Sequence, residues 1–264
     1  MAVITLTTEW KPSDFYYGII KGKLCTLCPG ITILENAGGI PPYNLAYASF
    51  IIRNTYYNYP KGSIHIICVH SEAEAGRGYL IVKAKDHFFI GTDNGIFNLI
   101  LNGEPDEVIS IDSSDKSDEL DVFSKAASGI LSGRDLSDLG TPVKNIQEKF
   151  PLRATIDKDV IIGSIIYIDS YGNAISNITR EIFSRVFEKK EFRILIQSNR
   201  NYTGKISQRY SDVPVGDLLG RFNQLDLLEI AVNGANVSEL LSLETGSVIR
   251  VDAVNKSAPK NSLL

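Results

Sequence analysis

The sequence lacks any hydrophobic run approaching the roughly 20 residues that a membrane-spanning helix needs, so we expect no membrane partner. It also lacks an excess of positive charge, because 27 Lys and Arg stand against 31 Asp and Glu, for a net charge of -4 and a pI near 5.5. A surface that binds nucleic acid usually carries a basic stripe, and nucleic acid is therefore not expected as a partner. No internal repeat or low-complexity tract is present. What remains is an ordinary globular composition over 264 residues, enough for one large or two modest domains.

Cysteine is scarce, and the three that occur, Cys25, Cys28 and Cys68, cannot all pair within one chain. Cys25 and Cys28 form a C-x-x-C, which is typical of a redox pair or of half a metal site, but no second pair follows and the histidines lack zinc-finger spacing. The spacing places both thiols on one face of a predicted helix, so we expect buried small side chains and no metal or redox cofactor. Unpaired cysteines fit a reducing cytoplasm. The first six residues lack a basic start and a cleavage site, so they predict a buried strand rather than a signal peptide.

Strand-like and helix-like segments alternate along the first half of the chain. The patterns predict strands over residues 3–7, 31–34 and 63–69, with helices over residues 14–27 and 43–56 between them. This alternation is typical of an α/β domain with a parallel sheet, right-handed crossovers and flanking helices.

Polar residues follow the ends of these strands, and open α/β sheets bind ligands beyond the carboxyl ends of their strands. The ends fall at residues 7–9, 35–36 and 70–72, and a turn at residues 91–95 follows a further predicted strand at residues 87–90. The polar side chains in or near these turns are Glu9, Asp14, His70, Arg77, Asp93 and Asn94. A single acidic residue at a helix start is most often a cap, whereas this many polar residues at one sheet edge indicate a site.

The pattern changes in the second half, where short strands separated by turn signals predict a mostly β domain. We place the junction between residues 151 and 159 and divide the chain into domains of residues 1–155 and 156–264. Residues 104–121 are acidic and polar, which predicts a solvated loop or a mobile cover over a site. A helix is expected over residues 119–131.

A compact polar motif follows the predicted strand over residues 160–168. It contains Asp169, Tyr171, Gly172 and Asn173. The ring offers a stacking face for a flat heterocycle, the amide can donate to and accept from a purine edge, and glycine lets the backbone approach a ligand closely. The alternative is a polar hairpin turn with no ligand.

Six segments stand in a distinctive order along the chain. They are T-E-W-K from Thr8, I-P-P from Ile40, Y-P-K-G-S-I-H from Tyr59, T-D-N-G from Thr92, D-S-Y-G-N-A-I-S-N-I from Asp169 and L-E-I-A-V-N from Leu228. In this order they resemble the motifs of the S-adenosyl-L-methionine hydroxide adenosyltransferases, which are adenosine-forming hydrolases related to the adenosyl halogenases. The resemblance covers nearly the whole chain.

The resemblance implies an N-terminal α/β domain with a mostly parallel sheet, a smaller β-barrel-like C-terminal domain, and a homotrimer that holds S-adenosylmethionine or adenosine between subunits. It implies an acid at Glu9 for the ribose hydroxyls, aromatic rings at Tyr43, Tyr171 and Tyr210 around the adenosyl group, and an acid at Asp169 for the methionine ammonium. The full set of binding residues that it implies is Glu9, Asp14, Tyr43, Asp93, Asn94, Asp169, Tyr171, Asn173, Tyr210, Asn223 and Glu229.

Two departures from the family pattern affect the catalytic positions. The hydrolases carry V-D-P-G-V-G-T-x-R, whereas residues 69–77 here place His70 at the Asp position and retain Arg77. Asp118 falls where the His of the family's H-G-R-D belongs. If the two positions have exchanged identities, His70 accepts a proton from water, Asp118 fixes its tautomer and Arg77 orients the water.

This set predicts hydrolysis of S-adenosylmethionine to adenosine and methionine. The alternatives are a relative that binds the ligand without turnover, a halide-dependent displacement, and a non-enzymatic nucleoside sensor.

Overall fold

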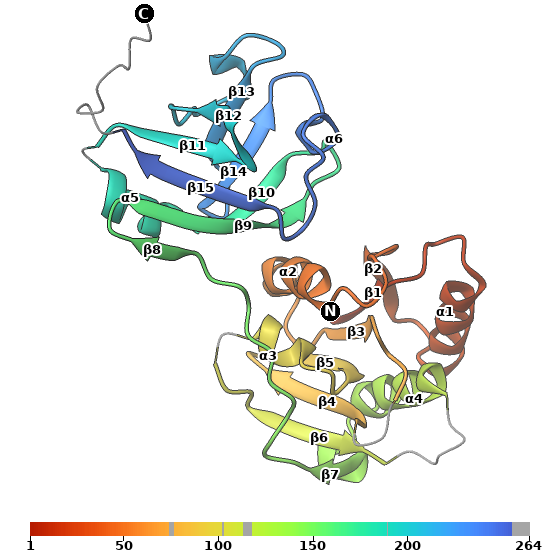
Figure 1. Ribbon diagram of the computed structural model, residues 1–264. Coiled ribbons are helices and arrows are strands. Elements are labelled where there is room, and N and C mark those ends of the chain that lie inside the picture. Colours follow the sequence, from red (N-terminus) through yellow and green to blue (C-terminus); the bar gives the residue numbers. More distant parts are fainter. Residues whose placement is uncertain (74–76, 102, 113–117, 189, 255–264) are drawn as a thin grey trace, which may run out of the picture. The chain divides into compact units, whose positions relative to one another are not determined.

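The computed structural model describes residues 1–73, 77–101, 103–112, 118–188 and 190–254 (Figure 1). The chain divides into two compact units, Met1–Pro151 and Leu152–Leu264. Within the described ranges, no helix combines the length and the apolar character that crossing a membrane requires.

The first unit is built on a mixed sheet whose described strands follow the order β2-β1-β3-β5-β4-β6-β7. Its strands are β1 (Val3–Thr8), β2 (Thr32–Ala37), β3 (Ile64–Cys68), β4 (Tyr79–Ala84), β5 (His87–Thr92), β6 (Glu107–Ile111) and β7 (Gly140–Pro142). The half formed by β2, β1, β3 and β5 is parallel, which confirms the predicted alternation. The strands β4, β6 and β7 pair antiparallel, so the expectation of a mostly parallel sheet is wrong for the other half.

Two local features explain this difference. β4 and β5 are joined by Lys85 and Asp86, which both have positive φ, at 51° and 64°, as a two-residue hairpin turn requires. β6 lies inside the acidic stretch that was expected to be a solvated loop, and that expectation is wrong for Glu107–Ile111. Val108 and Ile109 anchor this strand in the core.

Helices cover both faces of the first sheet (Figure 1). α1 (Phe15–Leu27) and α4 (Glu119–Leu131) pack on one face, and α2 (Leu45–Thr55) and α3 (Ile96–Ile100) pack on the other. Short 3-10 turns follow α2 and α4, η1 (Tyr56–Asn58) and η2 (Leu136–Asp138). The three longer helices match the predicted ranges closely, because each has a polar N-cap and a periodic apolar face. The caps are Asp14, Asn44 and Asp118.

The cysteines do not share one environment. Cys28 and Cys68 are buried, and burial raises the pKa of both thiols. Cys25 is exposed, so the expectation that both thiols of the C-x-x-C are buried is wrong. The buried face of α1 runs through Leu24, and Cys25 lies about 100° further round the helix, while Cys28 follows the last helical residue in a non-helical conformation.

The second unit is an antiparallel sheet with the order β12-β11-β15-β9-β10-β14-β13. A further short strand, β8, pairs with β9 outside this order. Its elements are β8 (Thr155–Asp157), β9 (Val160–Ile168), β10 (Ala174–Thr179), α5 (Arg180–Phe187), β11 (Phe192–Ile196), β12 (Ser198–Thr203), η3 (Tyr210–Asp212), β13 (Leu218–Phe222), β14 (Leu227–Val232), α6 (Val237–Leu240) and β15 (Val248–Ala253). Ile206, just after β12, bridges to Gly220 of β13, so the two ends of the sheet approach each other. The sheet is nearly closed and barrel-like, around a core that includes Ile161, Ile194 and Ile230.

Candidate functional site

The register of the first sheet brings several strand ends to one edge. Thr8 at the end of β1 pairs with Cys68 at the end of β3, and Thr92 at the end of β5 pairs with Tyr79. The residues that follow these strands, including Glu9 and His70, therefore lie at the carboxyl edge, where open α/β sheets bind ligands.

The end of β2 is held by internal contacts. Glu35 Oε2 accepts a hydrogen bond of 2.8 Å from the Tyr17 hydroxyl, and burial together with Glu35 raises the pKa of Tyr17 to about 12. Asn36 bonds to Thr7 and accepts from Tyr59. These side chains fix the strand end to its neighbours.

Glu9 connects two loops at this edge. Its Oε1 accepts a hydrogen bond of 3.1 Å from the backbone N–H of His70 and a second bond from the backbone N–H of Tyr43. Tyr43 and His70 both have positive φ, at 62° and 47°. Their rings meet edge to face with centroids 5.1 Å apart. The structure thus brings three of the predicted site residues into direct contact.

Asn94 also holds the His70 backbone, through the carbonyl oxygen of His70. Its side-chain amide donates to the carbonyl oxygens of His70 at 2.9 Å and of Val69 at 3.2 Å, and its Oδ1 accepts from the N–H of Ile96. Asn94 is only 2% exposed. Both of its N–H donors are therefore used by the protein, and its contribution to the site is to fix the His70 backbone.

Asp93 follows β5, and Arg77 precedes the neighbouring strand β4, where the Asp93 N–H donates to the carbonyl oxygen of Gly78. Asp93 Oδ1 accepts a hydrogen bond of 2.8 Å from the backbone N–H of Gln147. Burial raises the pKa of Asp93, while the Gln147 bond and the charge of Arg77 act in the opposite direction. Asp93 thus anchors the segment that leaves the first unit, with the Arg77 guanidinium close enough to act on its charge.

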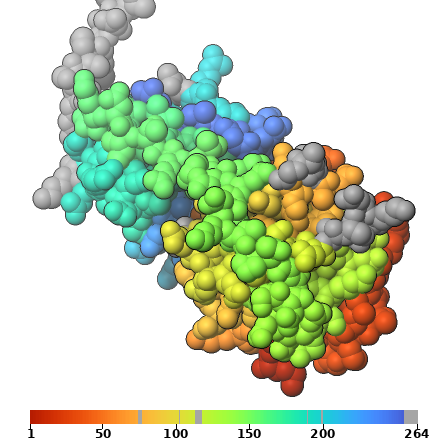
Figure 2. All heavy atoms as spheres, turned by 90° about the horizontal axis from the view of Figure 1, so that it is seen from below, coloured from red at the N-terminus to blue at the C-terminus, as the bar shows by residue number. Residues whose placement is uncertain are grey.

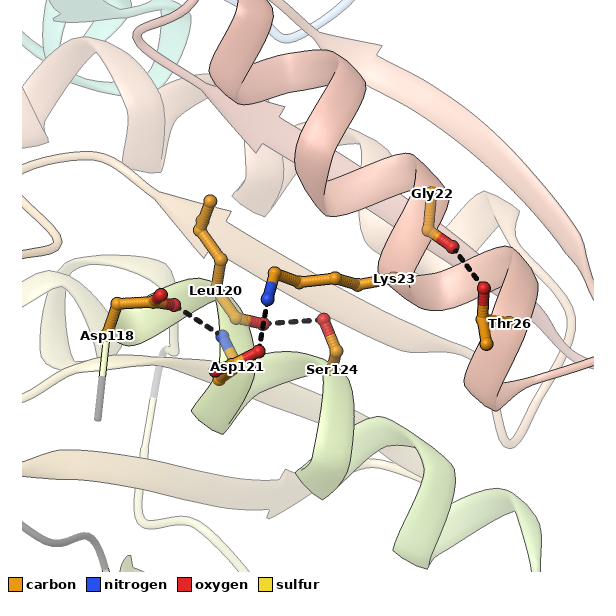
Figure 3. Close-up of polar contacts among 7 residues, drawn as sticks. All are labelled: Gly22, Lys23, Thr26, Asp118, Leu120, Asp121 and Ser124. Carbon is orange, nitrogen blue, oxygen red and sulfur yellow. Dashed lines mark hydrogen bonds and ion pairs between the residues drawn. The ribbon is translucent and has the colours of Figure 1, made fainter. Parts of the chain in front are cut away.

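Asp118 and Asp14 serve as helix caps. Asp118 Oδ1 accepts a hydrogen bond of 2.8 Å from the N–H of Asp121 at the start of α4, and Asp121 forms an ion pair with Lys23 of α1 (Figure 3). In the part of the chain that the structure describes, this is the only hydrogen bond to the Asp118 carboxylate. Asp14 accepts from the N–H of Tyr16 at the start of α1 in the same way.

A shallow groove of about 500 Å³ separates α1 from α4, whose outer surfaces lie beside each other in Figure 2. Its lining includes Gly18, Gly22, Lys23 and Lys125. None of the predicted site residues lines this groove, so it is separate from the candidate site.

The polar motif of the second unit forms the turn between β9 and β10. Asp169 Oδ1 accepts hydrogen bonds of 2.9 Å from the N–H groups of Tyr171 and Asn173, and its Oδ2 accepts from the Asn173 side chain, also at 2.9 Å. Gly172 has φ of 80°, and a Cβ placed on it would lie 1.8 Å from Asn236 Oδ1. The Tyr171 side chain is 79% exposed. The Asp169 carboxylate thus holds the backbone of the turn, and the Tyr171 ring is exposed to solvent.

A buried acid and a tyrosine lie next to this turn. The Tyr210 hydroxyl donates to Glu229 Oε1 at 2.7 Å and lies 3.5 Å from Asn173 Nδ2. Burial and the Glu229 carboxylate raise the pKa of Tyr210 to about 12, so this hydroxyl stays protonated at neutral pH. The structure therefore brings Asp169, Asn173, Tyr210 and Glu229 together.

Arg221 joins this group although the sequence analysis did not select it. Its guanidinium lies 4.6 Å from the centroid of the Tyr210 ring, and Arg221 pairs with Glu229 across β13 and β14. Its Nε is buried and has no hydrogen-bond partner among the described residues. The sequence feature that could have indicated Arg221 is the nearby Asn223. Its side chain accepts from the N–H groups of Leu225 and Leu227, and the turn that it forms sets the pairing of Arg221 with Glu229. Asn223 itself is a turn residue.

The described residues contain no group of three or more His, Cys, Asp or Glu side chains arranged to hold a metal ion. The site chemistry available is that of carboxylates, amides, aromatic rings, one imidazole and guanidinium groups.

Comparisons with known proteins define the class. The chain belongs to the SAM hydroxide adenosyltransferase family, because the family's N-terminal domain model matches residues 4–140 and its C-terminal domain model matches residues 163–250. Among curated relatives, a protein of Thermus thermophilus named (R)-S-adenosyl-L-methionine hydrolase is 23% identical over 95% of this chain and 100% of its own length. A protein of Salinispora arenicola with the same name is 22% identical over 95% of this chain and 97% of its own length.

A solved structure shares the fold. It is an uncharacterized conserved protein from Thermotoga maritima, with a TM-score of 0.83, 22% identity, and coverage of 95% of this chain and 100% of that one. At this identity the likeness concerns the fold alone.

Proposed function

We propose that the protein hydrolyses S-adenosyl-L-methionine to adenosine and L-methionine. The observation that carries the proposal is the position of His70, an imidazole at the carboxyl edge of the sheet, packed against Tyr43 and fixed through its backbone by Glu9 and Asn94. The names of the curated relatives, which align along nearly the whole chain, support the same reaction.

The reaction is a displacement at C5′. The oxygen of a water molecule bonds to C5′ while the C5′–S bond breaks, and its electron pair stays on sulfur. Methionine leaves as a neutral thioether, so the leaving group needs no proton. The protein must therefore place a water opposite the sulfur and remove one proton from it.

His70 is the proposed proton acceptor, since imidazole is the side chain that most often acts as a general base. Arg77 is proposed to orient the water, and Asp118 to supply a negative charge that favours the imidazolium. No metal or other cofactor is needed for these steps.

The remaining predicted residues are proposed to bind the substrate from the two units. In the first unit they are Glu9, Asp14, Tyr43 and Asp93, while Asn94 positions the His70 backbone. In the second unit they are Asp169, Tyr171, Asn173, Tyr210 and Glu229, while Asn223 forms the turn between β13 and β14. We propose that a homotrimer completes each site by joining the two groups from neighbouring subunits. Sedimentation of the purified protein tests this assembly, and a monomer at all concentrations would contradict it.

The direct test of the reaction is product analysis. Purified protein is incubated with S-adenosylmethionine, and the mixture is separated by chromatography. We expect adenosine and methionine in equal amounts. Unchanged ligand after prolonged incubation would contradict hydrolysis.

Replacing His70 with alanine is expected to lower kcat about 10²- to 10⁴-fold, the usual contribution of a general base. Binding of S-adenosylmethionine, measured by calorimetry, should stay within about threefold of wild type, because the imidazole acts on the water rather than on the ligand. A His70→Ala variant that turns over normally would exclude this role.

Asp118→Asn separates the charge of this residue from its capping role, because asparagine caps helices as well as aspartate does. We expect thermal stability to be preserved and kcat to fall about tenfold, on the order of the effect of one nearby charge. Asp121→Asn removes a charge three residues along the same helix and is the matched control, expected to leave kcat unchanged. Equal kcat values for Asp118→Asn and wild type would show that Asp118 only caps α4 and that its charge does not contribute to the reaction.

One observation favours a second candidate, a relative that binds S-adenosylmethionine without turning it over. Among the described residues, Asp118 accepts only from Asp121 N, so no carboxylate bond from Asp118 fixes the His70 tautomer. Equilibrium binding of S-adenosylmethionine with no product would select this candidate.

A further inference from the structure

The guanidinium of Arg221 stacks on the Tyr210 ring, with its central carbon 4.6 Å from the ring centroid. Within the described ranges, the Nε of Arg221 is buried and has no hydrogen-bond partner. A buried donor without a partner costs free energy, so its presence in a native structure needs an explanation. The stack on Tyr210 supplies a reason for an arginine at this position.

The Tyr210 side chain is held in two different ways. Its hydroxyl donates to Glu229 Oε1 at 2.7 Å, and Glu229 is buried. This bond fixes the direction in which the side chain points. It does not fix the plane of the ring, because the hydroxyl oxygen lies on the axis about which the ring turns and this rotation has only broad preferences. The guanidinium on one ring face limits that rotation.

We propose that Arg221 is a positioning residue that fixes the plane of the Tyr210 ring and so presents the opposite ring face to the purine base of the substrate. This inference rests on the proposed function. The Tyr210 side chain is 37% exposed, so the ring remains accessible although Arg221 covers one face. The Tyr210 hydroxyl also lies 3.5 Å from Asn173 Nδ2. The ring plane therefore sets the position of a stacked base relative to this amide.

The chemistry of arginine suits this task. Its guanidinium is planar, stacks on aromatic faces and keeps its charge. Lysine would place a positive charge near the ring without the flat contact. Methionine would give an apolar contact of similar length without either property. Arg221→Lys and Arg221→Met therefore separate the contributions of charge and shape.

A second stack in the same unit provides a matched control. The guanidinium of Arg193, on β11, lies 5.1 Å from the centroid of the Tyr202 ring, on β12. Neither residue belongs to the proposed site. This pair makes the same kind of contact, so its substitution reports the structural effect of losing a stack.

The contact itself is tested in the ligand-free protein by a double-mutant cycle of urea unfolding. The cycle combines Arg221→Met with Tyr210→Leu. We expect the two effects to be non-additive by about two- to fivefold in the unfolding equilibrium constant, as for other stacks of a cation on a ring. A cycle of Arg193→Met with Tyr202→Leu should give a coupling of similar size. Additive effects for Arg221 and Tyr210 would refute the contact.

The role in base binding is tested by calorimetry with adenosine. Arg221→Met should weaken binding about five- to tenfold, Arg221→Lys should weaken it less, and Arg193→Met should leave it unchanged. In a Tyr210→Leu background, Arg221→Met should cause no further loss, because Arg221 acts through the ring. A further loss in that background, or unchanged binding in Arg221→Met alone, would refute the positioning role.

Kinetics separate this role from a general structural effect. Arg221→Met should raise KM for S-adenosylmethionine about five- to tenfold, while kcat stays within about threefold of wild type. The reason is that binding of the base changes and the attack of water on C5′ does not. A fall in kcat with unchanged KM would contradict the role.

Failure of this inference and failure of the proposed function give different results. If wild type neither binds adenosine nor forms it from S-adenosylmethionine, the proposed function fails and the role in base binding fails with it, while the unfolding cycle still decides whether Arg221 holds Tyr210. If wild type binds and turns over normally and Arg221→Met behaves as wild type does, only this inference fails.

Discussion

Replacing Gly172 with alanine is expected to destabilise the second unit by about 3 kcal/mol and to abolish nucleoside binding. The new Cβ would lie 1.8 Å from Asn236 Oδ1, and the residue would have to keep φ near 80°. Asn236 cannot move freely, because its Oδ1 caps α6 by accepting from the N–H of Glu239. The turn that positions Asp169 and Asn173 would be displaced with it. Urea unfolding and adenosine calorimetry measure the two effects.

Gly216→Ala is the matched control for this substitution. Gly216 also has positive φ, at 91°, but a Cβ there meets nothing within 4 Å. Its replacement should cost only about 1 kcal/mol from backbone conformation and leave binding intact. Similar free energies of unfolding for the two variants would show that the contact with Asn236 does not contribute to the destabilisation.

Acid is expected to weaken the first unit well above the pH at which carboxylates titrate. His65 is buried in the sheet, where its Nδ1 pairs with Thr5 Oγ1 at 2.8 Å and its Nε2 with His87 Nδ1 at 3.1 Å. Burial, with a smaller effect of His87, lowers the pKa of His65 to about 3, and burial also lowers the pKa of His87.

The sign follows from which state binds the proton first. The pKa of histidine in the unfolded chain is about 6.5. Below this pH the unfolded state binds a proton at His65, whereas the folded state does not bind it until the pH approaches 3. The stabilisation is complete above about pH 6.5 and is lost as the pH falls toward 3. Between pH 7.5 and 5 we expect a loss of about 2 kcal/mol from His65, measured by urea unfolding.

His65→Gln provides the comparison, because glutamine keeps hydrogen-bonding atoms but does not titrate. This variant should lose about 2 kcal/mol less than wild type over the same pH interval, even if its stability at pH 7.5 is lower. An identical decline in both proteins would refute the role of the buried imidazole.

The elements with strong local signals were predictable from sequence. The helix over residues 119–131 has a capping aspartate and a regular apolar face, and it was predicted at its observed bounds. β4 was missed because the turn at Lys85 and Asp86 lacks the asparagine and glycine that usually mark a two-residue hairpin. β6 was missed because one of its faces is polar and lies within an acidic stretch.

The proximity of several polar strand-end residues was predictable from sequence, but the hydrogen bonds among them were not. Strand ends share an edge in a parallel sheet, so Glu9, His70 and Asn94 were expected near one another. The hydrogen bonds from Tyr43 and His70 to Glu9 depend on positive φ at two non-glycine residues, which is uncommon. No sequence pattern indicated positive φ at these two positions. Arg221 escaped notice because its contact with Tyr210 depends on the register of a hairpin.

The origin of the oxygen in the product tests the central claim most directly. The protein is incubated with S-adenosylmethionine in water enriched in ¹⁸O, and the nucleoside product is analysed by mass spectrometry. Hydrolysis at C5′ predicts adenosine with one labelled oxygen, at the 5′ position, and unlabelled methionine in equal amount. Intact S-adenosylmethionine at the end of the incubation, or a 5′-chloro nucleoside that forms only with chloride, would contradict the account.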